Sequence, residues 1–229
     1  MSIITNEQIL LRDETRMREL LESVRNGGVI IYPTETIYSI GGALSSKRAT
    51  ETIFALKERD SSNPLLAIVF DVRQAEAFTV VRYDLEQFLL TEFGYRGLTL
   101  ILDSRSFVAS EPRGGGPTLG VRLATTELTR ILTERVAEPL TSISASYFNT
   151  LFPNVGQGDI LPTSLDEIPH ELAQEVDYVI EAEHPPSGIL STIARVVDEN
   201  RIVILREGVL RASEIERYGL HIEHSETTG

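Results

Sequence analysis

The sequence has 229 residues, of which 41% are hydrophobic and 24% are charged, and these proportions are typical of a globular chain with a sizeable core. The formal net charge is −13, so the surface as a whole would repel a nucleic-acid backbone, and contact with RNA would need a local basic patch. The sequence contains no cysteine, which excludes disulfides, thiolate catalysis and cysteine-ligated zinc.

No apolar run approaches the roughly 20 residues that span a bilayer. The first residues lack the basic and then apolar pattern of a signal peptide. We therefore expect a cytoplasmic chain without membrane contact, organised as a single domain over residues 1–229. The core of that domain is expected over about 15–210, and a polar, frayed tail is expected beyond Gly219, over 220–229.

The elements predicted along the chain alternate between helices and strands. The spacing of apolar residues predicts a helix over 15–26, which Gly27 and Gly28 end. Ser46 is a good N-cap for a helix over 47–57, and a capping box at 164–167 opens a short one. Further helices are expected near 72–78, near 83–93 and around 128–132. Apolar runs predict strands over 29–32, 65–70, 98–102, 119–123, 139–143, 178–180, 192–197 and 202–205.

This order of elements, without a strict repeat, predicts an α/β (α+β) fold in which a twisted mixed β-sheet has helices packed on it. The first strand is expected to end at Tyr32, because Pro33 cannot donate to a central ladder. The segment 147–163 is rich in Asn, Gly, Gln and Pro, so it is expected to be a mobile loop.

The turn after this first strand is the first candidate for chemistry. Its sequence, Thr34-Glu35-Thr36, places two hydroxyls and a carboxylate at a strand end, where open α/β sheets commonly bind ligands. Proline and threonine are also ordinary turn residues, so the same pattern fits a purely structural turn.

Lys57 and Arg59 are the second candidate. They lie two residues apart and do not share a helix face, so they can converge only if the helix ends there and the chain turns. They could then grip a triphosphate, with the lysine as a point charge and the arginine as a bidentate fork. The alternative is a cationic helix C-terminus that complements the helix dipole.

Two later strands supply further polar groups. Arg122 lies near the end of one strand and could pair with a substrate carboxylate or lie on the surface. Ser142, Ser144 and Ser146 fall on one face of an extended strand, which makes a plausible ligand-binding edge.

Arg206 ends the last predicted strand, just ahead of Gly208, where a cation could lean over a phosphate. A routine strand exit is the alternative there. The four histidines have no metal-type spacing and no neighbouring nucleophile motif, so they are expected to be solvated surface residues.

Taken in order along the chain, these segments resemble the YrdC family of threonylcarbamoyl-AMP synthases. The similarity covers about residues 15–210. No single motif is specific for the family, but the series of motifs in this order is specific. The series is Tyr-Pro-Thr-Glu-Thr, Lys-x-Arg followed by Asn-Pro-Leu, Leu-Thr-Leu-Ile-Leu, Gly-Val-Arg, Ser-x-Ser-Ala, Ser-Thr-Ile and Leu-Arg-Glu-Gly.

The resemblance implies a YrdC-like fold with a concave, positively charged cavity. It implies an L-threonylcarbamoyladenylate synthase, a nucleotidyltransferase that uses L-threonine, bicarbonate and ATP, with Mg²⁺ carried by the ATP, and releases pyrophosphate. A downstream threonylcarbamoyl transferase would use the product to modify an adenosine of tRNA. By this likeness, threonine is bound by Thr34, Thr36, Arg122 and Ser142, and the nucleotide by Lys57, Arg59, Thr118, Ser144 and Arg206. Lys57 and Arg59 would also be the catalytic residues, and no protein side chain is expected to bind a metal.

The sequence departs from the family pattern at several positions. Ser146 takes the place of an asparagine, Ser39 that of a glycine, and Tyr95-Arg96-Gly97 that of Pro-Gly-Pro, while 147–149 replaces a stretch of small residues. A YciO-like subgroup also departs in the serine segment, whereas the Lys-x-Arg pair favours a synthase. Two other interpretations stay open: a module that binds double-stranded RNA without catalysis, and a paralogue with a different carbamoyl substrate.

Overall fold

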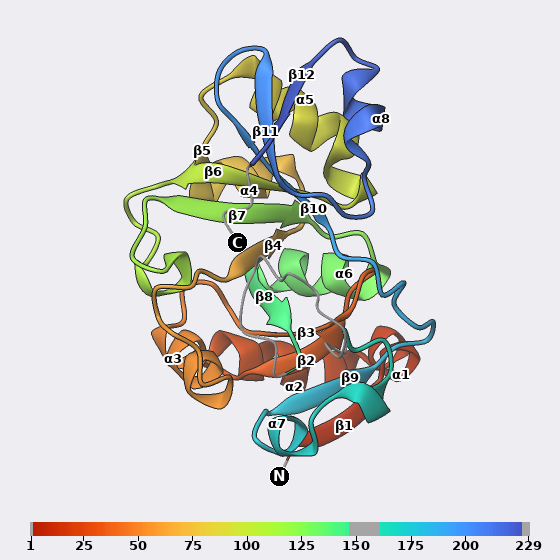
Figure 1. The fold of residues 1–229 in the computed structure, drawn as a ribbon. Coiled ribbons are helices and arrows are strands. Elements are labelled where there is room, and N and C mark those ends of the chain that lie inside the picture. Colours follow the sequence, from red (N-terminus) through yellow and green to blue (C-terminus); the bar gives the residue numbers. More distant parts are fainter. Residues whose placement is uncertain (1, 147–160, 226–229) are drawn as a thin grey trace.

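The computed structural model describes residues 2–146 and 161–225, and Figure 1 shows their arrangement. The strands of these residues are β1 (Ile3–Asn6), β2 (Ile30–Pro33), β3 (Tyr38–Gly41), β4 (Leu66–Val69), β5 (Thr79–Val80), β6 (Leu98–Ser104), β7 (Thr118–Leu123), β8 (Leu140–Ser144), β9 (Tyr178–Glu181), β10 (Thr192–Val196), β11 (Arg201–Arg206) and β12 (His221–His224). They form one sheet in the order β1-β9-β2-β3-β8-β4-β7-β6-β10-β11-β12, and β5 pairs with β6 beside this path. Parallel pairs such as β4 with β7 and antiparallel pairs such as β6 with β7 both occur, so the predicted mixed sheet is confirmed.

Helices connect most of these strands. They are α1 (Glu7–Arg12), α2 (Glu14–Arg25), α3 (Lys47–Leu56), α4 (Val72–Phe78), α5 (Asp84–Phe93), α6 (Glu127–Val136), α7 (His170–Gln174) and α8 (Ala212–Glu216). The predicted N-cap is present, because the Ser46 side chain accepts the Ala49 N–H at 3.1 Å. The predicted capping box at 164–167 is also present and opens a 3-10 turn ahead of α7. Within the residues that the structure describes, no helix has the length and apolar composition to cross a membrane.

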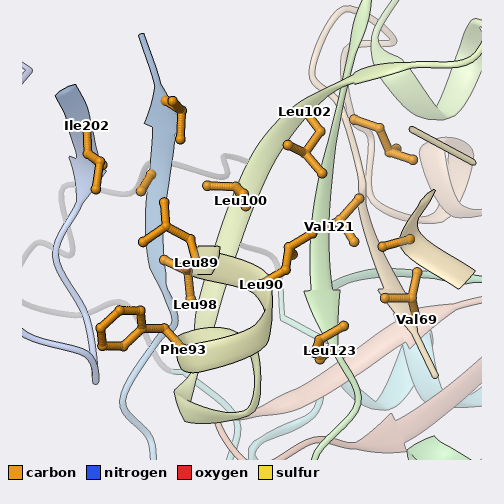
Figure 2. Packing of buried hydrophobic residues seen from close by; sticks show 14 of the residues in the cluster. Val69, Leu89, Leu90, Phe93, Leu98, Leu100, Leu102, Val121, Leu123 and Ile202 are labelled. Carbon is orange, nitrogen blue, oxygen red and sulfur yellow. The ribbon is translucent and has the colours of Figure 1, made fainter. Parts of the chain in front are cut away.

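The half of the sheet from β4 to β12 has its helices on one face. Apolar side chains of α4, α5 and α8 pack there against β4, β6, β7, β10 and β11. Figure 2 shows Leu89 and Leu90 of α5 lying near Leu100 of β6 and Val121 of β7, and Phe93 of α5 belongs to the same cluster. Full burial of each such side chain stabilises the fold by about 1.5–3 kcal/mol. The opposite face of β6 and β7 takes no part in this cluster.

The other half, formed by β1, β9, β2 and β3, has helices on both faces (Figure 1). Ile30 and Tyr32 of β2 pack with α1, α2 and α6, whereas Ile31, between them, packs with α3 and α7. This division follows from the alternation of side chains along a strand. The sheet therefore changes from three layers to two near β8 and β4, in the middle of the strand order.

Some short elements were not predicted from the sequence: β1, α1, β3, β5, α8 and β12. The expected fraying beyond Gly219 is wrong for 221–224, which pair with β11 as β12. There Ile222 packs against the apolar cluster, and Glu223 forms an ion pair with Arg201 at 3.2 Å. Polar composition misled the prediction because a strand adds to a sheet through backbone groups that every residue other than proline carries. Residues 226–229, and the 147–160 part of the expected loop, lie outside the described residues.

The expected end of β2 at Tyr32 is also wrong, since Pro33 pairs with Tyr38 of β3. The Tyr38 N–H donates to Pro162 O at 2.7 Å, and the Thr34 N–H donates to Ile37 O at 3.1 Å. The Tyr38 N–H therefore points away from Pro33, and the adjacent Thr34–Ile37 pair carries the hydrogen bond, so this position in the ladder needs no donor from the proline.

Candidate active site

The candidate site begins on the face of β6 and β7 that lies opposite α5. Thr99 and Arg122 are register partners on these antiparallel strands, so their side chains lie on the same face. Leu100 and Val121, one residue away on each strand, belong to the apolar cluster beneath α5. Arg122 therefore points to the face opposite α5, on the strand next to β4, where the number of layers changes.

The turn between β2 and β3 presents the two predicted threonines next to this arginine. The Thr34 and Thr36 hydroxyls lie 2.9 Å apart, and both residues are buried. Thr34 Oγ1 donates to Ile37 O at 2.8 Å, and Arg122 donates to Thr36 Oγ1 at 3.2 Å. The hydroxyls thus form a hydrogen-bonded chain from the arginine into the turn, which holds the turn in one conformation.

Arg122 also forms an ion pair with Glu35 of the same turn. Burial by itself would raise the pKa of the Glu35 carboxyl, but the charge and hydrogen bond of Arg122 hold this pKa below its ordinary value. The guanidinium, which is only 4% exposed, is therefore placed to receive a carboxylate. The pairing of Arg122 with a substrate carboxylate stays a prediction.

Lys57 and Arg59 converge in the manner that the sequence required. α3 ends one residue before Lys57, and Glu58 adopts a φ of 47°, which turns the chain. The Arg59 N–H returns to Phe54 O at 2.9 Å. Lys57 and Arg59 are only 3% and 6% exposed, so they are not solvated surface residues. Lys57 is the C-cap of α3, so the alternative of a cationic helix C-terminus stays open beside the binding role.

Backbone carbonyls hold both cations. Lys57 Nζ donates to Ser144 O at 2.8 Å and to Ser146 O, at the end of β8. Arg59 donates to two carbonyls of segment 63–64, at 3.1 and 2.9 Å. Burial, and then the charge of Arg59, lower the pKa of Lys57 to about 7, while burial lowers the pKa of Arg59 to about 10.

The hydroxyls of Ser142, Ser144 and Ser146 form a row on and just after β8, and the row lies beside Lys57. Ser142 Oγ donates to Ser39 Oγ at 3.1 Å, and Ser144 Oγ lies 2.9 Å from Ser146 Oγ. Ser39 and Ser144 are register partners on β3 and β8. The row therefore runs from the cation at the end of α3 to the strand that follows the threonine turn.

Arg206 reaches the site from β11. Its guanidinium donates to Ser191 O at 2.9 and 3.1 Å, and the Ser191 hydroxyl accepts from Thr99 Oγ1 at 2.9 Å. Burial, and then the charge of Arg122, lower the pKa of Arg206 to about 10. The two arginines are therefore close enough to repel each other.

Two nitrogen atoms of the site, Arg59 Nη1 and Arg122 Nε, are buried and have no hydrogen-bond partner among the described residues. Leaving a buried charged donor unsatisfied costs on the order of 1–3 kcal/mol. An oxygen of an anionic ligand would satisfy such donors. Within 2–146 and 161–225, no group of three or more His, Cys, Asp or Glu side chains could hold a metal.

Thr118 lies apart from the other predicted residues. Its register partner is Asp103, whereas that of Arg122 is Thr99, four residues earlier on β6. At about 3.3 Å per residue, Thr118 is roughly 13 Å from Arg122 along β7. It lines a separate hollow of about 210 Å³ with Arg82 and Asp103. Its role in nucleotide binding stays a prediction.

Three contact residues of the site were given no role in the sequence analysis: Ser39, Thr99 and Ser191. Glu35 was noted there as the carboxylate of the candidate turn, but its pairing with Arg122 was not predicted. Nothing local identifies Thr99, because its place beside Arg122 depends on strand register.

Fold and site together define a class of protein: a mixed α/β sheet in which buried cations and hydroxyls meet where three layers give way to two. The chain belongs to the Sua5_yciO_yrdC family, whose model, described as "Telomere recombination", matches residues 22–208. The family name joins the synthase and YciO subgroups, so the match does not separate them. The expected concave, positively charged cavity stays a prediction.

Two relatives are synthases by name. The chain is 27% identical to the threonylcarbamoyl-AMP synthase of Pyrococcus abyssi over 217 residues, which are 95% of this chain and 61% of that protein. It is 28% identical to a putative threonylcarbamoyl-AMP synthase of Methanocaldococcus jannaschii over 214 residues, which are 90% and 94% of the two chains. The crystal structure of P. abyssi Sua5 complexed with L-threonine matches with a TM-score of 0.82 at 26% identity, covering 97% of this chain and 62% of that one. The chain thus spans about three fifths of the Pyrococcus proteins.

Proposed function

We propose that this chain is an L-threonylcarbamoyladenylate synthase that joins L-threonine, bicarbonate and ATP and releases pyrophosphate. Its product would serve a downstream threonylcarbamoyl transferase that modifies tRNA. The similarity to named synthases, and to a Sua5 structure that holds L-threonine, supports this proposal. The observation that carries it is the burial of Lys57, Arg59 and Arg122 beside the hydroxyls of β8 and the β2–β3 turn.

The burial of these cations favours a small anion over an RNA duplex. Taking a charged group out of water costs several kcal/mol unless partners compensate it. Cations that contact a duplex must reach the surface, whereas these three are 3%, 6% and 4% exposed. A nucleotide or an amino acid is small enough to enter the expected cavity, whereas a duplex is not, and the net charge of −13 adds to this preference.

On the amino-acid side, Arg122 would receive the threonine carboxylate in a bidentate pair. Thr34, Thr36 and Ser142 would offer hydroxyls to the amino and hydroxyl groups of the substrate. Since Arg122 forms an ion pair with Glu35, binding would require the guanidinium to share or exchange that partner. The hydrogen bonds from Arg122 to Thr36 and from Thr36 to Thr34 would keep the guanidinium oriented during this exchange.

On the nucleotide side, Lys57, Arg59 and Arg206 would face the phosphates, and Ser144 would donate a hydrogen bond. The threonine nitrogen forms a bond to the carbon of CO₂ or bicarbonate, losing a proton and, from bicarbonate, an oxygen as water. A carbamate oxygen then attacks the α-phosphorus as the bond to pyrophosphate breaks. Fixed cations stabilise the charge on the phosphoryl oxygens, and alignment of the two reactants lowers the barrier further.

Mg²⁺ would arrive on the triphosphate. The described residues offer it hydroxyls and carbonyls rather than a cluster of carboxylates, so phosphate oxygens and water suit it as ligands. Bound there, the ion would neutralise part of the phosphate charge.

The test is to incubate the chain with Mg²⁺, ATP, bicarbonate and L-threonine and to follow pyrophosphate and the adenylate by mass spectrometry. We expect product only when all substrates are present. Lys57→Ala and Arg59→Ala should each lower the rate by about 100-fold or more while the circular dichroism spectrum is unchanged. Lys47→Ala, on the exposed face of the same helix, is the matched control and should retain full activity.

The same preparations separate the other interpretations. Salt-sensitive binding of double-stranded RNA that is indifferent to ATP, without pyrophosphate release, would replace the synthase by a binding module. Pyrophosphate release that requires another amino acid in place of threonine would identify a paralogue. Wild-type rates in both Lys57→Ala and Arg59→Ala would refute the roles assigned to these residues.

A further inference from the structure

The two edges of the sheet differ in how they are protected. An edge strand presents unpaired backbone groups, and proteins usually guard it with charges, proline or a bulge. β12 forms one edge and carries Glu223, which pairs with Arg201 at 3.2 Å. β1 forms the other edge, at the bottom of the molecule in Figure 1, and residues 2–6 contain no charged side chain and no proline.

The side chains of this unguarded edge are apolar and exposed. Ile3 is 52% exposed, Ile4 is 69% exposed, and Ile9 of the following helix is 45% exposed. These are three of the nine large hydrophobic side chains that are exposed in the described residues, and they lie within seven positions of one another. Ile3 and Ile4 are successive strand residues and point to opposite faces of the sheet, so the edge strand exposes an apolar side chain on each face.

A hollow adjoins the strand on one face. It has a volume of about 450 Å³ and is lined by Ser2, Ile4, the α7 residues His170, Ala173 and Gln174, and Glu175. Ile4 is the register partner of Val179, whose side chain packs in the α3–α7 cluster, so Ile4 lies on the α7 side of the sheet. The edge therefore carries the exposed Ile4 side chain and the hollow on the same face.

The backbone of Ile4 is directed away from the sheet. The Ile3 N–H donates to Asp177 O of the segment that leads into β9, at 2.9 Å. Because successive backbone groups of a strand point to opposite sides, the N–H and C=O of Ile4 point outward from β9. They are the groups that a further strand would bind.

We propose that β1 pairs with β1 of a second copy of this chain, antiparallel and across a two-fold axis at Ile4. In that pairing the two Ile4 residues exchange both of their outward hydrogen bonds, and each Ile4 side chain lies beside the hollow of the other copy. A two-fold interface needs a surface that complements itself, and an exposed side chain beside a hollow on one face meets this need.

The distribution of charge also favours the β1 edge as the contact between two copies. Two chains of net charge −13 repel each other over most of their surfaces, so they approach best through an uncharged segment. Residues 2–6 provide one, whereas the β12 edge would bring Glu223 of both copies together. This interface is independent of the proposed synthase activity.

The absence of native cysteine allows a direct test by a single introduced thiol. In the proposed pair the two Ile4 Cα atoms would lie about 5.5 Å apart, within the roughly 4.4–6.8 Å that a disulfide spans. Ile4→Cys should therefore form a disulfide-linked dimer under mild oxidation. Phe107→Cys, at a loop position that is 65% exposed, is the matched control and should stay monomeric.

Sedimentation of the wild type from micromolar to submillimolar concentrations should show a species of twice the 25.4 kDa chain mass. Ile4→Pro removes the outward donor without removing a hydrogen bond to β9, and Ile4→Lys adds like charges, so both variants should sediment as one chain. Phe107→Lys should keep the wild-type mass. The proposal is overturned if the wild type sediments as one chain at all concentrations, if Ile4→Pro remains dimeric, or if both cysteine variants cross-link equally.

Discussion

Lys57 should gain a proton when the nucleotide binds. Its pKa of about 7 leaves roughly nine tenths of the molecules neutral at this position at about pH 8. Phosphate oxygens beside Nζ would favour the charged form and return the pKa towards its ordinary value of 10.5. Binding should therefore take up about 0.9 proton near pH 8, about 0.5 near pH 7 and about 0.1 near pH 6.

Titration calorimetry in two buffers of different ionisation enthalpy measures this proton number directly. The chain has only one other lysine, Lys47, whose side chain is 68% exposed on α3, so Lys47→Met is a close control and should take up protons as the wild type does. Lys57→Met should bind the nucleotide more weakly and lose the pH-dependent uptake. Proton uptake that is constant from pH 6 to 8, or unchanged in Lys57→Met, would refute the reasoning.

Three further predictions concern stability. An unfolded lysine keeps a proton that folded Lys57 loses above about pH 7, so the free energy of unfolding should rise by about 1.4 kcal/mol per pH unit towards pH 10. Urea melts at several pH values should show a smaller slope for Lys57→Met than for the wild type, and equal slopes would contradict this prediction. Gly41→Ala should cost about 2 kcal/mol or more, because the new Cβ would lie 1.7 Å from Thr141 O, whereas Gly116→Ala, with its nearest atom at 3.4 Å, should change the melting temperature little. Thr192→Val should cost about 2–3 kcal/mol in the same melts, because its buried hydroxyl accepts one backbone N–H and donates to one carbonyl, and a cost near zero would exclude a role for these bonds.

The long elements of the fold were predictable because each carries its own local pattern. The helix over 47–57 has a capping serine and apolar spacing, and α3 appears there. The short elements have no such pattern. β3 spans only four residues, and β12 is a polar segment that becomes a strand because β11 offers it a backbone partner.

The candidate site was predictable where the sequence itself sets the geometry. Lys57 and Arg59 are separated by one residue, and a turn at Glu58 is enough to bring them together. Ser142 and Ser144 share a face because strand side chains alternate. The ion pair of Glu35 with Arg122 was not predictable, because it joins residues that are far apart in the chain.

By itself, the sequence determined the class of fold, most of the helices and strands, and the side chains available for chemistry, because periodicity, caps and residue type are local properties. Tertiary structure alone decided which strands are neighbours, that Arg122 faces Thr36 while Thr118 lies apart, and that β1 is an unguarded edge. It also decided the pKa of Lys57, since the burial that lowers it is created by segments that meet only when the sheet forms.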